Sequence, residues 1–422
     1  MQVAIVGGGI VGLALAIGLR KRGIAARVYE AAPELKELGL GITLLPHAMR
    51  ELAALDVDVR TAGIELHTSR FYNRFGQLIF EEPRGIAAGY PHPEVSIHRG
   101  RLHRLLHHKA LEVLGPEGIV TDRKLVTFSQ DETGVNLVFE CLSGAPRPPP
   151  VRADILIGCD GINSAVRKTL YPADQVVFTG INTWRGVTWH KPILDGRTYL
   201  RIGSIRTGKI VIYPIANSTN GDGLQLINWV AELQGPSAVM NDWNKAGRLE
   251  DILPIYEDWE FDWLNVPALI SGAENLLEYP MVDKDPLDRW TFGRTTLAGD
   301  AAHPMYPRGS NGSAQGLIDA RVLAELLAAG GDPIAALRAF EAERIGPTGD
   351  VVRTNRSTPP DIINIRVEEL TNDQPFDNLD LLITQDELRR LSDNYKRIAG
   401  FAAEQSGARL ATSDSESGRK GK

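Results

Sequence analysis

Cysteine is scarce in this chain, which has only Cys141 and Cys159 among its 422 residues. Their spacing matches no metal-binding or redox motif, so we interpret both as buried or incidental thiols and expect no metal site. Such sparing use of cysteine is typical of a reducing compartment. We therefore expect a cytoplasmic protein.

Long apolar runs and an excess of basic residues are also missing. The longest apolar runs are shorter than a bilayer span, and no basic segment precedes the first strand-like residues as it would in a signal peptide. The net charge of −7 argues against nucleic acid as the main partner, because binding to phosphates normally depends on a basic surface. We expect neither membrane nor nucleic acid as a partner.

What the sequence does contain is a strand–turn–helix–strand pattern at its amino terminus. The segment VAIVG (3–7) predicts a short buried strand, and residues 10–22 carry apolar side chains at helical spacing. Gly23 then predicts the end of the helix, and ARVYE (26–30) predicts a second strand. The pattern is typical of a nucleotide-binding β-α-β unit.

The turn of this unit fits the dinucleotide fingerprint. Gly7 allows the tight turn, Gly9 lets the backbone approach a pyrophosphate, and Gly12 lets helix and strand pack closely. The helix start, with Ile10 and Val11, would present free N–H groups to the phosphates.

Glu30 ends the second predicted strand. Its carboxylate could accept both ribose hydroxyls of an adenosine and would repel a 2′-phosphate, so NADP is not expected at this position. The fingerprint alone does not distinguish FAD from NAD.

A second motif lies in ADILIGCDGINSAVRKTL (153–170). An apolar strand ends at Asp160 and Gly161, and a helix follows, with Ser164 placed to cap it and Arg167 on its first turn. An ordinary strand-to-helix turn explains this segment equally well when it is taken alone.

A third motif lies in residues 294–320. The segment TTLAG predicts a buried strand ending at Gly299 and Asp300, and a helix is predicted from residue 313 to about residue 329. Asp300 could accept hydrogen bonds from sugar or ribityl hydroxyls. The N–H groups of Gly312, Ser313 and Ala314 begin the helix and would stabilise negative charge on a reduced flavin.

Together the three motifs resemble the single-component (group A) flavoprotein aromatic hydroxylases, which share the para-hydroxybenzoate hydroxylase fold. Within this class, the loop residues MYPRGSNG (305–312) most resemble the corresponding loop of the phenazine-type hydroxylases. The resemblance implies that Gly41 and Ile42 pass the flavin ring, that Arg99 contacts FAD, and that adenine rests near Leu125. It also matches Asp160, Gly299 and Asp300 to FAD-binding positions.

The implied fold is α/β. We expect a Rossmann-like FAD-binding domain of the glutathione-reductase type, an inserted mixed β-sheet substrate domain and C-terminal helices. The expected boundaries are 1–65, 97–180 and 285–350 for the FAD-binding domain, 66–96 and 181–284 for the substrate domain, 351–406 for a helical segment and 407–422 for a disordered tail. The alternating segment FYNRFGQLIFEEP (71–83) predicts a hairpin in the substrate domain, and residues 385–401 predict an amphipathic helix in the helical segment.

The substrate pocket is expected on the inserted sheet, whose strands are rich in aromatic and β-branched residues. Candidates are Trp184, Arg185, Tyr213, Pro214, Asn228 and Trp229, and the alternative for each is a place in the core or on the surface of the sheet. Arg185 could pair with a substrate carboxylate or reach solvent, and Tyr213 could assist deprotonation of a phenol. By resemblance, the carbonyl of Pro307 lies beside the reacting oxygen.

The resemblance implies an FAD-dependent monooxygenase that uses NADH or NADPH and O₂ to hydroxylate an aromatic or heteroaromatic molecule, carboxylated substrates included, through a flavin C4a-hydroperoxide. A flavin-dependent reductase or dehydrogenase without oxygen insertion could use the same three motifs. A nucleotide-sensing protein without catalysis is a third alternative. The expected oligomeric state is a monomer or a homodimer.

Overall fold

The computed structural model describes residues 1–34, 40–236 and 245–402. The end of the expected helical segment and the expected disordered tail, residues 403–422, lie outside the described residues. Among the described residues, no helix is both long and apolar enough to cross a membrane.

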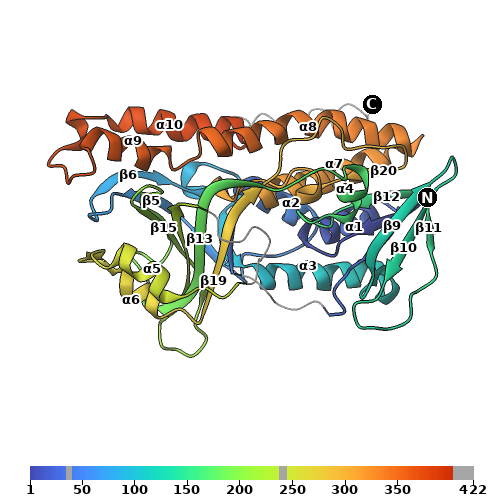
Figure 1. Ribbon diagram of the computed structural model, residues 1–422, viewed down its shortest axis with the longest axis horizontal. Helices are drawn as coiled ribbons and strands as arrows, with labels where there is room; N and C mark the ends of the chain where they lie inside the picture. Colours follow the sequence, from blue (N-terminus) through green and yellow to red (C-terminus); the bar gives the residue numbers. More distant parts are fainter. Residues whose placement is uncertain (35–39, 237–244, 403–422) are drawn as a thin grey trace, which may run out of the picture.

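A parallel five-stranded sheet forms the nucleotide-binding half, at the right of Figure 1. Its order is β20 (Thr295–Leu297), β12 (Ile155–Gly158), β1 (Gln2–Val6), β2 (Ala25–Tyr29) and β8 (Ile119–Val120). The predicted strands at 3–7, 26–30, 155–159 and 295–299 are therefore confirmed to within two residues. Almost every residue of β1 and β12 is buried, as expected for a parallel sheet that is covered on both faces.

Helices pack around this sheet. α1 (Ile10–Lys21) packs against both α3 (Arg99–Leu114) and α7 (Gly312–Ala328). The predicted helices at 10–22 and 313–329 are confirmed, and α4 (Ala165–Leu170) begins at the predicted cap, because the Ser164 side chain accepts a hydrogen bond from the Arg167 N–H.

Two small antiparallel sheets flank the nucleotide-binding half. One contains β11 (Val151–Ala153), β10 (Val135–Glu140) and β9 (Lys124–Gln130). The other contains β3 (Gly41–Leu44), β7 (Glu94–His98) and β4 (Ile64–Leu66), and α2 (Pro46–Ala54) follows β3 directly.

A seven-stranded sheet forms the other half. Its order is β19 (Asn275–Asp283), β13 (Val177–His190), β16 (Gln225–Gln234), β15 (Gly208–Asn217), β14 (Thr198–Ser204), β5 (Thr68–Tyr72) and β6 (Leu78–Pro83). All neighbouring pairs are antiparallel except β14 with β5, so the predicted mixed sheet and the predicted hairpin of β5 and β6 are confirmed. Its outer face is covered by α5 (Leu249–Tyr256), the pair β17 (Glu260–Phe261) and β18 (Leu264–Asn265), and α6 (Val266–Ser271).

Three C-terminal helices lie along one edge of the molecule and span both halves (Figure 1): α8 (Pro333–Ser357), α9 (Ile362–Thr371) and α10 (Gln385–Ile398). α8 packs on α7, whereas α9 packs on β14 and β5. The amphipathic helix predicted at 385–401 is confirmed, and it begins with a capping box between Thr384 and Glu387.

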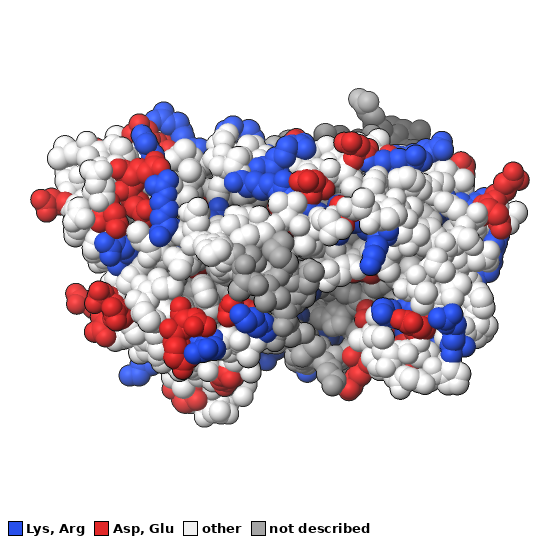
Figure 2. All heavy atoms as spheres, in the orientation of Figure 1, with Lys and Arg blue, Asp and Glu red and all other residues white. Residues whose placement is uncertain are grey.

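Charged side chains of both signs are interspersed over the face drawn in Figure 2, and no continuous basic patch covers it. That distribution agrees with the acidic net charge.

Candidate functional site

The three motifs meet at one edge of the five-stranded sheet. Val6 of β1 pairs with Gly158 of β12, and Gly158 pairs with Leu297 of β20, all in parallel register. Because parallel strands end at the same edge, Gly7, Asp160 and Gly299 come together there. Ligands of open α/β sheets bind outside this carboxyl edge.

The three fingerprint glycines have different surroundings. A Cβ on Gly7 would lie 2.4 Å from the Cys159 carbonyl oxygen, and a Cβ on Gly12 would lie 2.0 Å from the Gly7 carbonyl oxygen. Gly7 also has a φ of +107°. A Cβ on Gly9 would meet no protein atom within 4 Å. Gly7 and Gly12 are therefore required by the fold itself, whereas Gly9 leaves open space in front of the α1 N-terminus.

Glu30 follows β2 and bonds the glycine turn. Its carboxylate accepts hydrogen bonds from the N–H of Gly8 at 2.7 Å and from the N–H of Ala32 at 2.8 Å. The turn is held from the other side by His103 of α3, whose Nε2 lies 2.6 Å from the Gly8 carbonyl oxygen. A carbonyl only accepts, so Nε2 carries the hydrogen. His103 could not be predicted from the sequence, because the contact joins residues far apart in the chain.

Leu125 is buried in β9 beside the end of β2. It pairs with Phe139 of β10, whose ring stacks on Tyr29 at 4.8 Å between centroids. Leu125 therefore belongs to the core that supports the Glu30 end of the site.

The side chains of Asp160 and Arg167 form hydrogen bonds and an ion pair with other residues of the protein. The Asp160 carboxylate accepts hydrogen bonds from Ser164 Oγ at 2.5 Å and from the Ala165 N–H at 2.7 Å, at the start of α4. Arg167 is fully buried and forms a two-pronged ion pair with Asp174 at 2.8 Å.

Arg167 also reaches the third motif. Its Nη1 donates to the Ala302 carbonyl at 2.9 Å, which ties the second motif to the residues that follow Asp300. The sequence located Arg167 but not this bond.

Asp300 has a carboxylate that makes no hydrogen bond among the described residues. The side chain keeps accessible surface, yet enough protein surrounds it that burial raises its pKa, while His303 and then Arg99 lower it by smaller amounts. Arg99, the exposed first residue of α3, lies close enough for its charge to act on the Asp300 carboxylate.

Behind Asp300 lies a fully buried charge network. Asp319 of α7 accepts a hydrogen bond from the Gly299 N–H at 2.9 Å, lies 2.5 Å from His303 Nε2, and pairs with Arg344 of α8 at 2.8 Å. Burial would raise the pKa of Asp319, but His303 and Arg344 hold it below its usual value. His303 therefore has a structural role in this network.

The loop between β20 and α7 carries Met305, Tyr306 and Pro307. Tyr306 is buried and Pro307 is exposed. α7 then begins at Gly312 without a side-chain cap from Asn311, so the N–H groups of its first turn stay available.

The two halves of the molecule meet at β3. The Gly41 N–H donates to Asn228 Oδ1 of β16 at 2.7 Å, and a Cβ on Gly41 would lie 2.6 Å from the Asn228 side chain. Asn228 is 1% exposed, and its Nδ2 has no hydrogen-bond partner in the structure. Gly41 and Ile42 thus lie against the seven-stranded sheet, next to the Asn228 Nδ2 group, which has no hydrogen-bond partner among the described residues.

Arg185, Tyr213 and Asn228 share the inner face of that sheet, which is the face toward β3. Strand register supports this: Val187 pairs with Asn228, and Asn228 pairs with Tyr213. Tyr213 stacks on Tyr199 with their rings 5.1 Å apart.

The expectation that Trp184 and Trp229 join this pocket is wrong. Both lie on the outer face, in the core under α5 and α6, where Trp229 Nε1 donates to Thr188 at 3.1 Å. Successive side chains of a strand point to opposite faces of the sheet. Because Arg185 and Asn228 point to the inner face, their neighbours Trp184 and Trp229 point to the outer face.

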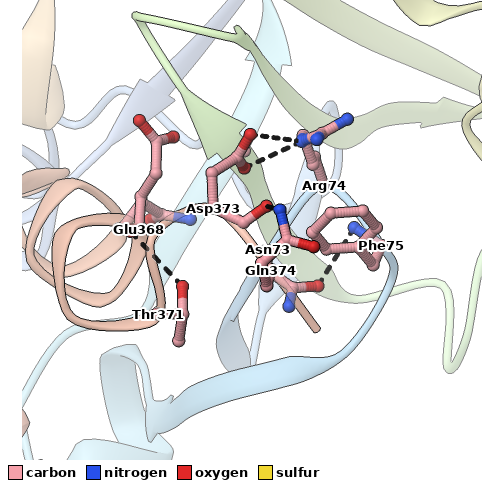
Figure 3. A pocket seen from close by; sticks show the side chains of 9 residues that line it. Asn73, Arg74, Phe75, Glu368, Thr371, Asp373 and Gln374 are labelled. Carbon is pink, nitrogen blue, oxygen red and sulfur yellow. Dashed lines mark hydrogen bonds and ion pairs between the residues drawn. The ribbon is translucent and has the colours of Figure 1, made fainter. Parts of the chain in front are cut away.

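A surface pocket lies between the β5–β6 turn and α9 (Figure 3), at the other end of the molecule from β1, β12 and β20 (Figure 1). Arg74 there pairs with Asp373 at 2.8 Å, and Thr371 Oγ1 donates to the Glu368 carbonyl at 3.3 Å. Its polar lining is largely bonded to itself, so we interpret it as a junction between hairpin and helix.

The residues at the carboxyl edge fit a dinucleotide such as FAD. Gly9 leaves space against the backbone that a side chain would fill. The N-termini of α1 and α7 are not capped by side chains, and the Asp300 carboxylate has no hydrogen-bond partner among the described residues. Among the described residues, no group of three or more metal-binding side chains is present.

Comparison with known proteins gives the same picture. A family model described as an FAD binding domain matches residues 1–232 and 280–345. Phenazine 1,6-dicarboxylic acid hydroxylase PhzS of Lysobacter antibioticus is 38% identical over 362 residues, covering 84% of this chain and 89% of that protein. 3-Amino-4-hydroxybenzoate 2-monooxygenase PtnB3 of Streptomyces platensis is 33% identical over 364 residues, covering 84% of this chain and 87% of that protein.

Among solved structures, HpxO of Klebsiella pneumoniae complexed with FAD and uric acid superposes with a TM-score of 0.73. It is 21% identical, and the match covers 96% of each chain. At 21% identity, this similarity shows the fold alone.

Proposed function

This chain belongs to the FAD binding domain family, and on that premise we propose that it hydroxylates a planar, carboxylated heteroaromatic ring of the phenazine type. It is an FAD-dependent aromatic monooxygenase, as its relatives are. The observation that carries the substrate class is the 38% identity, over most of both chains, to a hydroxylase of phenazine 1,6-dicarboxylic acid.

FAD, when bound, supplies the reaction with O₂. We propose that the chain holds it through the residues of the carboxyl edge and its surroundings: Gly7, Gly9, Ile10, Val11, Gly12, Glu30, Gly41, Ile42, Arg99, Leu125, Asp160, Gly299, Asp300, Gly312, Ser313 and Ala314. The α1 N-terminus would face the pyrophosphate, Asp300 the ribityl hydroxyls and the α7 N-terminus the flavin ring.

The remaining partners in this proposal are O₂ and NADH or NADPH as electron donor. Met305, Tyr306 and Pro307 would exclude water from the reacting side of the site, which limits loss of electrons to hydrogen peroxide. The low number of cysteines supports a cytoplasmic location. The proposed oligomeric state is a monomer or a homodimer, and light scattering distinguishes the two.

The inner face of the seven-stranded sheet would bind the substrate. Arg185 lies there across from Val230, on the same face as Tyr213 and Asn228. A guanidinium beside aliphatic and aromatic side chains suits a flat ring that carries a carboxylate. Tyr213 would face the ring and assist deprotonation where the substrate is a phenol.

Arg185→Ala tests this proposal. We expect the dissociation constant of phenazine-1-carboxylic acid, from titration of flavin absorbance, to rise about tenfold or more, because a hydrogen bond to a charged group contributes about 1.5–3 kcal/mol. The affinity for unsubstituted phenazine should stay unchanged.

The matched control is Arg206→Ala, which removes an exposed arginine paired with Glu369 at 2.9 Å. It should alter neither affinity. An equal loss for acid and neutral ligand in Arg185→Ala would contradict the assignment of Arg185 to the carboxylate.

A further inference from the structure

The C-terminal helix α10 touches the loop that precedes α7. The Tyr395 hydroxyl accepts a hydrogen bond from Asn311 Nδ2 at 2.9 Å, and it lies 2.9 Å from Asn355 Oδ1 of α8 and 3.2 Å from the Arg308 carbonyl oxygen, both of which can accept its proton. The ring is 4% exposed. One buried hydroxyl therefore connects α8, α10 and both ends of the segment 308–311.

This segment has an unusual backbone. Gly309 has a φ of +76° and Ser310 a φ of +57°, so two consecutive residues are left-handed. For serine that conformation costs free energy and persists only where the surroundings impose it. A Cβ on Gly309 would lie 1.9 Å from the Tyr395 hydroxyl oxygen. The close approach of Tyr395 thus depends on glycine at this position.

Further bonds continue from α10 to the start of α7. Gln315 Nε2 donates to the Ala399 carbonyl at 3.1 Å, and Asn355 Nδ2 donates to the Tyr306 carbonyl at 3.0 Å. Phe401 stacks on His47 of α2 at 5.2 Å between ring centroids. The C-terminal helices α8 and α10 and the residues after α10 consequently contact α2, the loop before α7 and the first turn of α7.

The opposite side of the loop is held by the seven-stranded sheet. Arg308 is 6% exposed, and its Nη2 lies 3.3 Å from Asp361 at the start of α9. Lys209 bridges Asp361 at 3.2 Å and Glu232 at 2.8 Å. Because this second anchor is independent of Tyr395, loss of the hydroxyl should loosen the loop without unfolding it.

We propose that Tyr395 is a positioning residue: its hydroxyl holds the Arg308–Asn311 loop, and with it the N–H groups of Gly312, Ser313 and Ala314, in the conformation that receives the flavin ring. The inference rests on the proposed function for its consequence in catalysis. If the loop relaxes, the N–H groups move and water enters, so more of the reduced cofactor's electrons end in hydrogen peroxide.

Tyr395→Phe is the test, and Thr188→Val is its matched control. Thr188 is also 4% exposed, and its hydroxyl donates to the Leu269 carbonyl at 2.8 Å, but it lies beside Trp229 on the outer face of the sheet. For Tyr395→Phe we expect faster amide hydrogen exchange in peptides covering 306–316 of the apoprotein. The dissociation constant of FAD should rise about two- to tenfold, as expected for one hydrogen bond. The peroxide yield per NAD(P)H should also rise.

Thr188→Val should leave exchange in 306–316, FAD affinity and peroxide yield at wild-type values, because Thr188 contacts neither anchor of the loop. Asn311→Ala removes the same hydrogen bond from the loop side, so the double variant should loosen the loop no more than either single variant. Unchanged exchange in 306–316 for both Tyr395→Phe and Asn311→Ala overturns the proposal, and so does an equal effect of Thr188→Val.

Failure of the proposed function is distinguishable. A wild-type protein that binds FAD but hydroxylates no carboxylated heteroaromatic contradicts the proposed substrate class. The exchange and FAD-affinity results still decide the role of Tyr395 in that case.

Discussion

Single residues at the glycine turn separate what the fold needs from what a ligand needs. Gly12 is closed in by the Gly7 carbonyl, so any side chain there must push α1 away from β1. A Cβ on Gly9 would meet none of the described protein atoms within 4 Å, so packing does not require glycine there. A pyrophosphate lying against the backbone would require it, because a side chain would occupy the same space.

This difference leads to a prediction for two alanine variants. Gly12→Ala should lower the melting temperature of the apoprotein and abolish FAD binding, because the new Cβ meets backbone. Gly9→Ala should leave the apoprotein melting temperature unchanged and weaken FAD binding about tenfold or more. Thermal unfolding with and without FAD measures both, and a destabilised Gly9→Ala apoprotein would contradict our interpretation of the turn.

At the same scale, the sequence predicted residue types well where chemistry needs a particular backbone or charge. Glycine spacing identified Gly7, Gly9 and Gly12, and strand ends identified Glu30 and Asp300. It did not predict their partners, such as His103 on the Gly8 carbonyl or Arg167 on the Ala302 carbonyl. Those bonds join residues about a hundred positions apart, and local patterns carry no information on them.

Among the elements, α7 is the one whose placement decides the site. Its N-terminus faces the third motif, and Asp319 on its buried side fastens it to β20 and α8 through Gly299, His303 and Arg344. Removing one partner of a buried ion pair leaves the other charge uncompensated, which costs about 3–5 kcal/mol.

Asp319→Asn should therefore lower the free energy of unfolding by about 3 kcal/mol at neutral pH, measured by denaturant titration. The pKa of Asp319 is lower in the folded protein than in the unfolded chain, so its contribution is present at neutral pH and is lost as pH falls through the folded-state pKa. The gap between variant and wild type should narrow accordingly in acid.

Glu325→Gln is the control on the same helix. Glu325 pairs with Arg321 at 2.6 Å on the surface, and exposed pairs contribute little. It should change the free energy of unfolding by less than about 0.5 kcal/mol. A comparable loss from both variants would show that the Asp319 network has no special role.

Element types were predictable because periodicity and capping residues are local. The helices at 10–22 and 385–401 and the strands of both large sheets follow from that information. The end of α8 and all of α9 lie within the helical segment expected at 351–406, although residues 354–385 are polar and interrupted by proline, so the sequence did not locate α9 itself. α9 is stabilised by packing on β14 and β5, which a weak local pattern does not reveal.

The whole molecule places an open carboxyl edge against the inner face of a second sheet. The halves touch where Gly41 meets Asn228 and where Arg308 lies between Asp361 and Glu232, and the C-terminal helices span both (Figure 1). The sequence predicted the two halves and their order. It misassigned the faces of Trp184 and Trp229, because both faces of this sheet are apolar and buried, so the alternation did not identify the inner one.

The most direct measurement is transfer of oxygen from isotopically labelled O₂. The FAD-loaded protein is supplied with NAD(P)H, labelled O₂ and phenazine-1-carboxylic acid, and the product is analysed by mass spectrometry. We expect a hydroxylated product that carries one labelled oxygen atom and depends on added FAD. A product whose new oxygen comes from water, or oxidation of NAD(P)H with no labelled product from any carboxylated heteroaromatic, would contradict the function proposed for this chain.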